Sequence, residues 1–145
     1  SYSSMLAYIS GNKSNFVDCD MAKASAGVWA AEQIKADVYA FYEKRRKEMY
    51  ALDFDDLLLY THKILKEKED VRRKWQRRFS FIHVDEFQDV DMLQYDIIRM
   101  LVKDGRYLCV VGDPDQTIYS WRVALVDFIM IFEMDFPDSI TVILN

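Results

Sequence analysis

An apolar run that ends on two adjacent carboxylates is the feature of this sequence with the clearest chemical potential. Residues 79–84 are mostly apolar, and Asp85 and Glu86 follow them directly. In parallel α/β folds, acids at the carboxyl end of a strand hold a hydrated magnesium ion and supply a catalytic base beside a nucleotide. Acids in this position also serve as caps of the next helix, so the pair alone leaves both roles open.

A second run of the same design follows further along the chain. Residues 107–111 are apolar and lead into a polar turn that contains Asp113 and Gln116. Neither run alternates apolar and polar residues, which predicts that both strands are buried. If they are parallel neighbours joined by a helix over 91–103, the polar residues after both strands meet at one edge of the sheet. The sequence therefore predicts one site there.

Three ordered stretches resemble motifs of superfamily 1 DNA helicases of the UvrD/Rep/PcrA type. Val-Asp-Glu-Phe-Gln-Asp-Val at 84–90 resembles motif II, and Val-Val-Gly-Asp-Pro-Asp-Gln-Thr-Ile-Tyr-Ser-Trp-Arg at 110–122 resembles motif III. Leu-Asp-Phe-Asp-Asp-Leu at 52–57 resembles a stretch that precedes motif II. The resemblance implies an α/β fold, with a helical 1B-like insertion and its return helices over 1–78. A partial P-loop (RecA-like) 1A motor core with a short parallel sheet would follow over 79–145.

The resemblance also implies an activity, namely ATP-dependent movement along single-stranded DNA, in the 3′ to 5′ direction and up to duplex junctions. Asp85 would hold Mg²⁺ through its water shell, and Glu86 would deprotonate the water that attacks the γ-phosphate. Gln116 would sense the γ-phosphate of ATP, since an amide both donates and accepts hydrogen bonds, and Asp113 would also belong to the cofactor-binding residues. The implied cofactors are ATP and Mg²⁺.

The end of the motif III stretch carries the implied DNA contacts. Trp121 alone would favour a core aromatic, but within the motif it is expected to stack on a base of single-stranded DNA, with Tyr119 beside it. Arg122 would contact DNA or couple it to the nucleotide. Val123 stands where the family usually has glycine, and a β-branched residue does not tolerate a positive φ.

The 145 residues contain no Gly-x-x-x-x-Gly-Lys-Ser/Thr loop. We therefore interpret the chain as a segment of a longer helicase and expect it to be inactive by itself, because nothing in it would cradle the phosphates. Two alternatives are open. The chain could be a non-catalytic nucleic-acid or protein interaction module, or the helicase part of a helicase-nuclease.

Composition sets broader limits. The chain is 51% hydrophobic and can bury one core, with or without a helical appendage. Its net charge of −5 is unevenly distributed, because residues 63–78 hold 8 basic and 3 acidic side chains. This stretch is equally consistent with a solvated helix face and a phosphate-contacting surface. Cys19 and Cys109 have no metal-binding spacing, and without a signal peptide or a bilayer-length apolar run we expect a cytoplasmic protein.

The periodicity of apolar residues predicts the elements. A long helix is expected over 21–50, with Ala30, Ile34, Val38 and Phe41 on its apolar face. Asp53 is expected to cap the next helix. The remaining expectations are the tail of a helix over 1–10, a loop over 11–20, a basic helix over 71–78, strands over 79–84, 107–111 and 140–144, and helices over 91–103, 114–120 and 124–134.

Several polar residues near these motifs have ordinary structural explanations. Gln88 and Asp89 either complete motif II or cap the helix that begins near Asp91, where Asp91 and Gln94 form a capping-box pattern. Asp55 and Asp56 are expected to be structural.

The two histidines and one cysteine also receive expectations. His83 should be a hydrogen-bonded core residue and His62 should lie on a helix surface. Cys109 should be buried as a small apolar residue.

Overall fold

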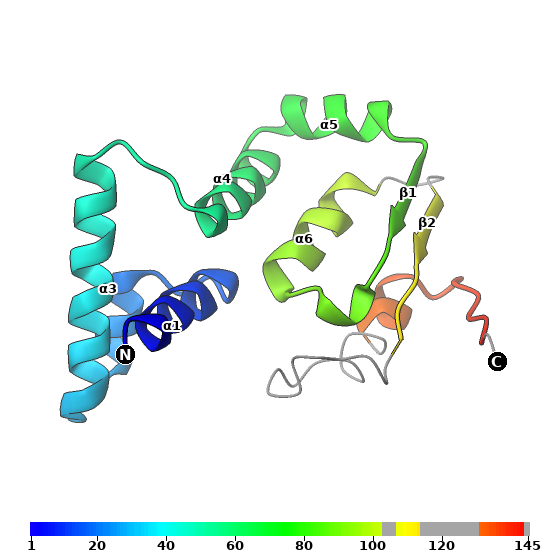
Figure 1. The fold of residues 1–145 in the computed structure, drawn as a ribbon. Helices are drawn as coiled ribbons and strands as arrows, with labels where there is room; N and C mark the ends of the chain where they lie inside the picture. The colour runs from blue at the N-terminus through cyan, green and yellow to red at the C-terminus, as the bar shows by residue number, and fades with distance from the viewer. Residues whose placement is uncertain (103–106, 114–130, 144–145) are drawn as a thin grey trace. The chain divides into compact units, whose positions relative to one another are not determined.

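The computed structural model describes residues 1–102, 107–113 and 131–143, and the fold is given for these (Figure 1). The helices are α1 (Tyr2–Ser14), α2 (Cys19–Ser25), α3 (Ala30–Glu48), α4 (Phe54–Glu67), α5 (Glu69–Arg78) and α6 (Met92–Leu101), and the strands are β1 (Phe81–Val84) and β2 (Tyr107–Val110), with a 3-10 turn at Phe87–Asp89. The chain forms two compact units. The helical unit contains residues up to Ser80 and the segment from Asp91, and the strand unit contains Phe81–Val90 and the segment from Tyr107.

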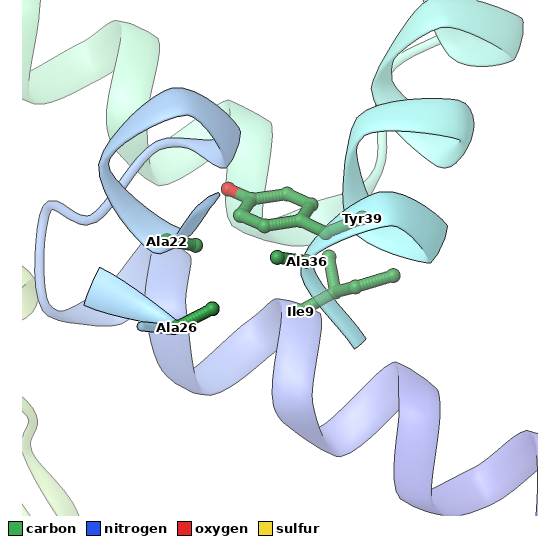
Figure 2. Close-up of a cluster of buried hydrophobic side chains, with 5 residues drawn as sticks. All are labelled: Ile9, Ala22, Ala26, Ala36 and Tyr39. Atoms are coloured by element: carbon green, nitrogen blue, oxygen red, sulfur yellow. The ribbon is translucent and has the colours of Figure 1, made fainter. Parts of the chain in front are cut away.

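A small apolar core holds the first three helices together (Figure 2). Its buried side chains come from α1, from α2 and its C-cap, and from α3, and they are Ile9, Ala22, Ala26, Ala36 and Tyr39. Three of the five are alanines, so the helices can approach closely although little apolar area is buried. The Tyr39 hydroxyl donates a hydrogen bond to the Val17 carbonyl at 3.2 Å, which satisfies the polar end of the largest core residue.

The helix predicted over 21–50 is two helices. Gly27 has φ +56°, a left-handed conformation that a glycine adopts without steric cost, and the chain turns there between α2 and α3. The predicted apolar face is also wrong, because Ile34 and Phe41 are 61% and 65% exposed. Ala36 and Tyr39 are buried instead, in the core that α3 forms with α1 and α2.

The loop predicted over 11–20 is also shorter than expected, because α1 continues to Ser14. Two asparagines that suggested a turn stay within the helical path. The Asn12 side chain donates to the Tyr8 carbonyl and the Asn15 side chain donates to the Gly11 carbonyl, both at 2.7 Å. The bond from Asn15 satisfies one of the last carbonyls of α1, which have no partner within the helix.

Two predicted helix starts are confirmed. Asp53 and Asp56 form a capping box at the start of α4, and Asp91 and Gln94 form another at the start of α6. Helices α4 and α6 are joined by His62, whose Nε2 lies 2.8 Å from an Asp96 carboxylate oxygen. His62 is therefore buried, and the prediction of a surface position is wrong.

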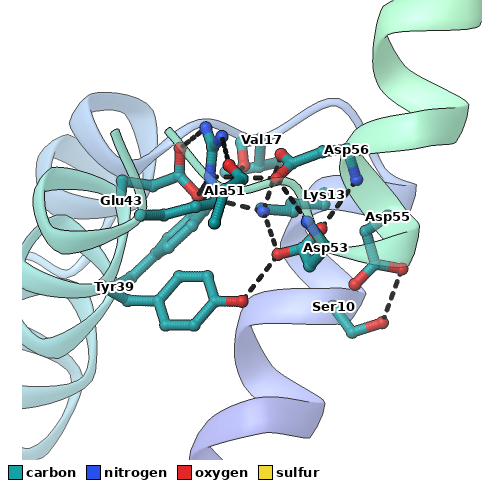
Figure 3. Close-up of polar contacts among 11 residues, drawn as sticks. Ser10, Lys13, Val17, Tyr39, Glu43, Ala51, Asp53, Asp55 and Asp56 are labelled. Carbon is teal, nitrogen blue, oxygen red and sulfur yellow. Dashed lines mark hydrogen bonds and ion pairs between the residues drawn. The ribbon is translucent and has the colours of Figure 1, made fainter. Parts of the chain in front are cut away.

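A buried charged network links α1, α3 and the start of α4 (Figure 3). The Lys13 ammonium lies 2.6 Å from Asp53, 2.9 Å from Asp56 and 3.0 Å from Glu43. Arg46 adds ion pairs to Glu43 at 2.7 Å and to Asp56 at 2.9 Å. Two cations thus face three carboxylates, which is the pairing that buried charges require. Here the predicted structural role of Asp56 is borne out.

The network shifts the pKa values of its members. Burial by itself would lower the pKa of Lys13, but its hydrogen bonds to Asp53, Asp56 and Glu43 outweigh burial and raise it. Burial would raise the pKa values of Glu43 and Asp53, yet the bonds from Arg46 and Lys13 to Glu43, and chiefly from Lys13 to Asp53, leave both below their ordinary values. Asp55 stands outside the network and accepts a hydrogen bond from Ser10 at 3.1 Å.

The strand unit is built on β1 and β2, which pair in parallel as predicted. Phe81 pairs with Tyr107 and Val84 with Val110. The described residues 131–135 are helical, which agrees with the end of the helix predicted over 124–134, whose earlier part lies outside the described residues. Phe132 packs edge-on against Phe87 at a ring separation of 5.8 Å.

The prediction that both strands are buried is wrong. Alternate residues of each strand are exposed, among them His83 and Cys109, so neither is the core residue that was expected. The physical reason is that the described residues cover one face of the two-stranded sheet, while the continuous apolar runs suit a sheet covered on both faces. Residues 140–143 do not form the predicted strand.

Two further observations complete the fold. The predicted stretch 114–120 lies outside the described residues. Among the described helices, none combines the length and apolar character needed to cross a membrane.

Replacing Lys13 with methionine should destabilise the helical unit by about 3 to 5 kcal/mol, because three carboxylates would lose their central cation inside the protein. Urea unfolding of the purified chain, followed by far-UV circular dichroism, measures this loss. Lys23→Met is the matched control, since Lys23 forms an exposed pair with Asp37 and its loss should leave the unfolding midpoint nearly unchanged. Equal unfolding midpoints for the two variants would contradict the account.

The stability of the helical unit should fall in acid. Glu43 and Asp53 have pKa values below their ordinary 4.5 and 3.8, so the unfolded chain takes up protons first. Their stabilisation is present above those ordinary values and is lost as the pH falls through the lower folded values. Unfolding midpoints measured across this pH window check the direction. Glu43→Gln should flatten the dependence, whereas Glu67→Gln at an exposed site of α4 should leave it unchanged.

Candidate active site

The turn after β1 presents the two predicted carboxylates to solvent. Asp85 and Glu86 follow the last strand residue, and both are exposed. Glu86 has φ +51° and ψ +43°, a left-handed conformation that is uncommon for a residue with a side chain and costs of order 1 to 3 kcal/mol. The Glu86 N–H donates to an Asp85 carboxylate oxygen at 3.0 Å. This local bond supports the turn.

Backbone hydrogen bonds continue past the strands and join the two turns. The Val111 N–H donates to the Val84 carbonyl at 2.8 Å, and the Phe87 N–H donates to the Val111 carbonyl at 2.9 Å. The residues after β1 and those after β2 are thereby held side by side. Asp85, Glu86 and Asp113 consequently lie at the same edge of the sheet, where the parallel arrangement was expected to place them.

Gln88 connects these turns through its side chain. It is 3% exposed, its Oε1 accepts from the Asp113 N–H at 3.0 Å, and its Nε2 donates to the Glu86 carboxylate. Gly112 makes this close approach possible, because a Cβ at that position would lie 2.8 Å from the Gln88 Oε1. Both ends of the amide are thus in use.

Two roles were open for Gln88 and Asp89, namely completing motif II or capping α6. The cap of α6 is Asp91, with Gln94 completing the box, so neither Gln88 nor Asp89 is that cap. Gln88 belongs to the motif II turn. In the part of the chain that the structure describes, Oδ1 of Asp89 is buried without a hydrogen-bond partner.

The other predicted site residues are not described. Gln116, Tyr119, Trp121 and Arg122 lie outside the described residues, as does Val123. Their predicted roles stay predictions.

Sequence reasoning did not foresee the bridge by Gln88. Its hydrogen-bond partner is a backbone N–H 25 residues away, and no spacing rule reports such a contact. Gly112 was the available signal, because a glycine between an apolar strand and a polar turn often marks close approach of another backbone.

A second group of carboxylates lies in the helical unit. Glu43, Asp53 and Asp56 each offer an oxygen within 4.8 Å of the others, a donor set suited to a hard cation. The Lys13 ammonium already bonds all three. This group is therefore neutralised by the protein itself, and the exposed acids after β1 are the better candidates for binding a metal.

Comparison with known proteins now decides the family. Residues 2–137 match the UvrD/REP helicase N-terminal domain. The chain belongs to this family. The resemblance carried by the three sequence motifs is thereby confirmed.

Named relatives agree with the family assignment. The chain is 39% identical over 143 residues to the ATP-dependent DNA helicase PcrA of Bacillus subtilis, covering 98% of this chain and 19% of the relative. It is 38% identical over 142 residues to PcrA of Leuconostoc citreum, covering 97% and 19%. It is also 40% identical over 110 residues to a probable DNA helicase II homologue of Mycoplasma capricolum, covering 76% and 15%. The chain thus spans about a fifth or less of each relative.

Proposed function

We propose that this chain is the motif II and motif III segment of an ATP-dependent DNA helicase or translocase that moves 3′ to 5′ on single-stranded DNA. Residues 1–78 would correspond to the helical 1B-like insertion and its return helices, and residues 79–145 to part of the RecA-like 1A core. The observation that carries the proposal is the position of Asp85 and Glu86 beside Asp113, at the carboxyl edge of a parallel strand pair. Family membership supports it.

Asp85 and Glu86 suit two different tasks. Asp85 follows the strand directly and is exposed, which fits a carboxylate that holds Mg²⁺ through water molecules, since magnesium keeps most of its hydration shell. When bound, the ion would offset the negative charge of the ATP phosphates. Glu86, held in its left-handed turn, would orient the attacking water and accept its proton.

The segment after β2 would sense ATP and DNA together. Asp113 is the first residue of this segment and lies at the same edge of the sheet as Glu86. Gln116 would contact the γ-phosphate. Trp121 would stack on a base of single-stranded DNA near a duplex junction, with Tyr119 and Arg122 as further contacts. Nucleotide state and DNA grip would then share one short stretch of chain.

We also propose that the 145 residues alone do not hydrolyse ATP. No phosphate-binding loop of the Gly-x-x-x-x-Gly-Lys-Ser/Thr type occurs among them, so ATP would lack its main anchor. Activity is therefore tested in the full-length gene product. A cytoplasmic site of action stays a prediction.

Glu86→Gln in the full-length protein should lower the kcat of DNA-stimulated ATP hydrolysis by about 100-fold or more, because the amide cannot accept the proton. Binding of a fluorescent ATP analogue should remain within about twofold, since Glu86 is not expected to hold the nucleotide. Steady-state phosphate release and equilibrium titration supply the two measurements.

Glu133→Gln is the matched control, because Glu133 is an exposed glutamate of the same unit. The 145-residue chain serves as the negative control. Undiminished hydrolysis by Glu86→Gln, or turnover by the 145-residue chain, would refute the proposed division of labour.

Trp121→Ala in the full-length protein should weaken single-stranded DNA binding by about 1 to 3 kcal/mol, the usual contribution of one stacked base. Fluorescence anisotropy with a labelled oligonucleotide measures the affinity at fixed salt. Trp121→Phe should retain much of it, and Trp29→Ala, at a position 73% exposed in the helical unit, should retain all of it. An unchanged affinity for Trp121→Ala would return this residue to a core role.

A further inference from the structure

The orientation of the Gln88 side-chain amide follows from which of its neighbours donate hydrogen bonds and which accept them. A backbone N–H can only donate a hydrogen bond and an ionised carboxylate can only accept one. The Gln88 Oε1 must therefore face the Asp113 N–H, and the Nε2 must face Glu86. A single orientation of the amide satisfies both neighbours.

Because Gln88 is buried, any other orientation of its amide is energetically costly. Gln88 is 3% exposed, so turning the amide away would leave polar atoms without water and cost about 1 to 3 kcal/mol. Gly112 lies against the Oε1 side of the amide. A Cβ at this position would lie 2.8 Å from that oxygen and 3.3 Å from the Gln88 backbone nitrogen. The Oε1 of the amide is thus fixed by the backbone after β2, and the Nε2 of the same amide holds the Glu86 carboxylate.

Glu86 depends on this support. Its backbone is in the left-handed region, and within the described residues the hydrogen bond to its carboxylate comes from Gln88. The Val84 carbonyl and the Phe87 N–H both bond Val111, so the turn is anchored to the end of β2 on both sides of Glu86.

We propose that Gln88 is a positioning residue that ties the placement of the Glu86 carboxylate to the backbone at Asp113. The inference rests on the proposed function, in which Glu86 is the base and the segment from Asp113 senses ATP and DNA. A shift of the Asp113 backbone moves the Gln88 amide, and the amide moves Glu86. Hydrolysis thereby responds to the state of the segment after β2 without any contact between Glu86 and DNA.

The first variant is Gln88→Glu in the full-length protein. A glutamate has the same shape and still accepts from the Asp113 N–H, but it places a like charge against Glu86. Repulsion between the two carboxylates should displace Glu86, so kcat should fall about 10-fold or more while the KM for ATP stays within about twofold.

The second variant is Gln88→Met, which fills the same space and makes neither hydrogen bond. With Glu86 no longer held, kcat should fall about 10- to 100-fold while the KM for ATP stays within about twofold, because a displaced base affects chemistry more than binding. The ratio of DNA-stimulated to DNA-free hydrolysis should fall as well.

Gly112→Ala tests the same contact without changing Gln88. Its added Cβ would displace the Oε1, so kcat should fall as it does in Gln88→Met. In the Gln88→Met background the alanine should cost much less, giving a non-additive double-mutant cycle. Circular dichroism and nucleotide binding establish that each variant is folded. If the Gln88 variants do not fold, Gly112→Ala alone tests the positioning role.

Glu86→Gln separates the two levels of the argument. If Glu86→Gln still hydrolyses ATP, the proposed function fails and Gln88 has no base to position. If Glu86→Gln is inactive but the Gln88 variants and Gly112→Ala keep the normal kcat, the positioning role is wrong and the proposed function survives. A lowered kcat with an unchanged KM for ATP in the Gln88 variants, together with a non-additive cycle, supports the role.

Discussion

The parallel pairing of β1 with β2 is the constraint on which the candidate site depends. In a parallel pair the carboxyl ends of both strands lie at the same edge, so whatever follows each strand is brought together. Here the pairing continues one residue further, through the Val111 N–H and carbonyl, into the motif II turn. Asp85, Glu86 and Asp113 become neighbours although more than 25 residues separate the two turns along the chain. A single slip in register would separate them.

The helical unit is held together in a different way. Its apolar core consists of a few side chains, three of them alanines, and the charged network around Lys13 supplies the connection from α1 and α3 to the start of α4. Ion pairs of this kind need matched geometry to offset the cost of burying charge. The capping box and the ion pairs with Lys13 give structural roles to Asp53 and Asp56 of the acidic stretch at 52–57, which resembles a family motif.

Sequence reasoning was reliable where local chemistry decides structure. The capping boxes at Asp53 and Asp91 follow from residues three apart in the chain, and the structure has them. The parallel pair follows from the order strand, helix, strand, and it is also present. Sequence reasoning was unreliable where packing decides. The apolar stripe with Ile34 and Phe41 is regular, yet Ala36 and Tyr39 on another face of α3 are buried, because periodicity identifies a stripe but not the surface that covers it.

The same distinction applies to the site. Asp85 and Glu86 could be predicted as site residues because they directly follow a strand. The role of Gln88 depends on the Asp113 N–H, which only the fold brings close to it. Buried His62 is a comparable case, since its partner Asp96 lies on a helix 34 residues away. Such long-range polar contacts carry no local signature.

The most direct test of the central claim is a structure of the full-length protein with Mg²⁺ and a transition-state analogue of ATP hydrolysis. The measurement is the distance from the Glu86 carboxylate to the water aligned with the γ-phosphate position. The account predicts a hydrogen bond of about 2.6 to 3.2 Å, with Asp85 bonded to a water of the magnesium shell. A nucleotide bound away from this edge, or a Glu86 carboxylate turned from that water, would contradict it.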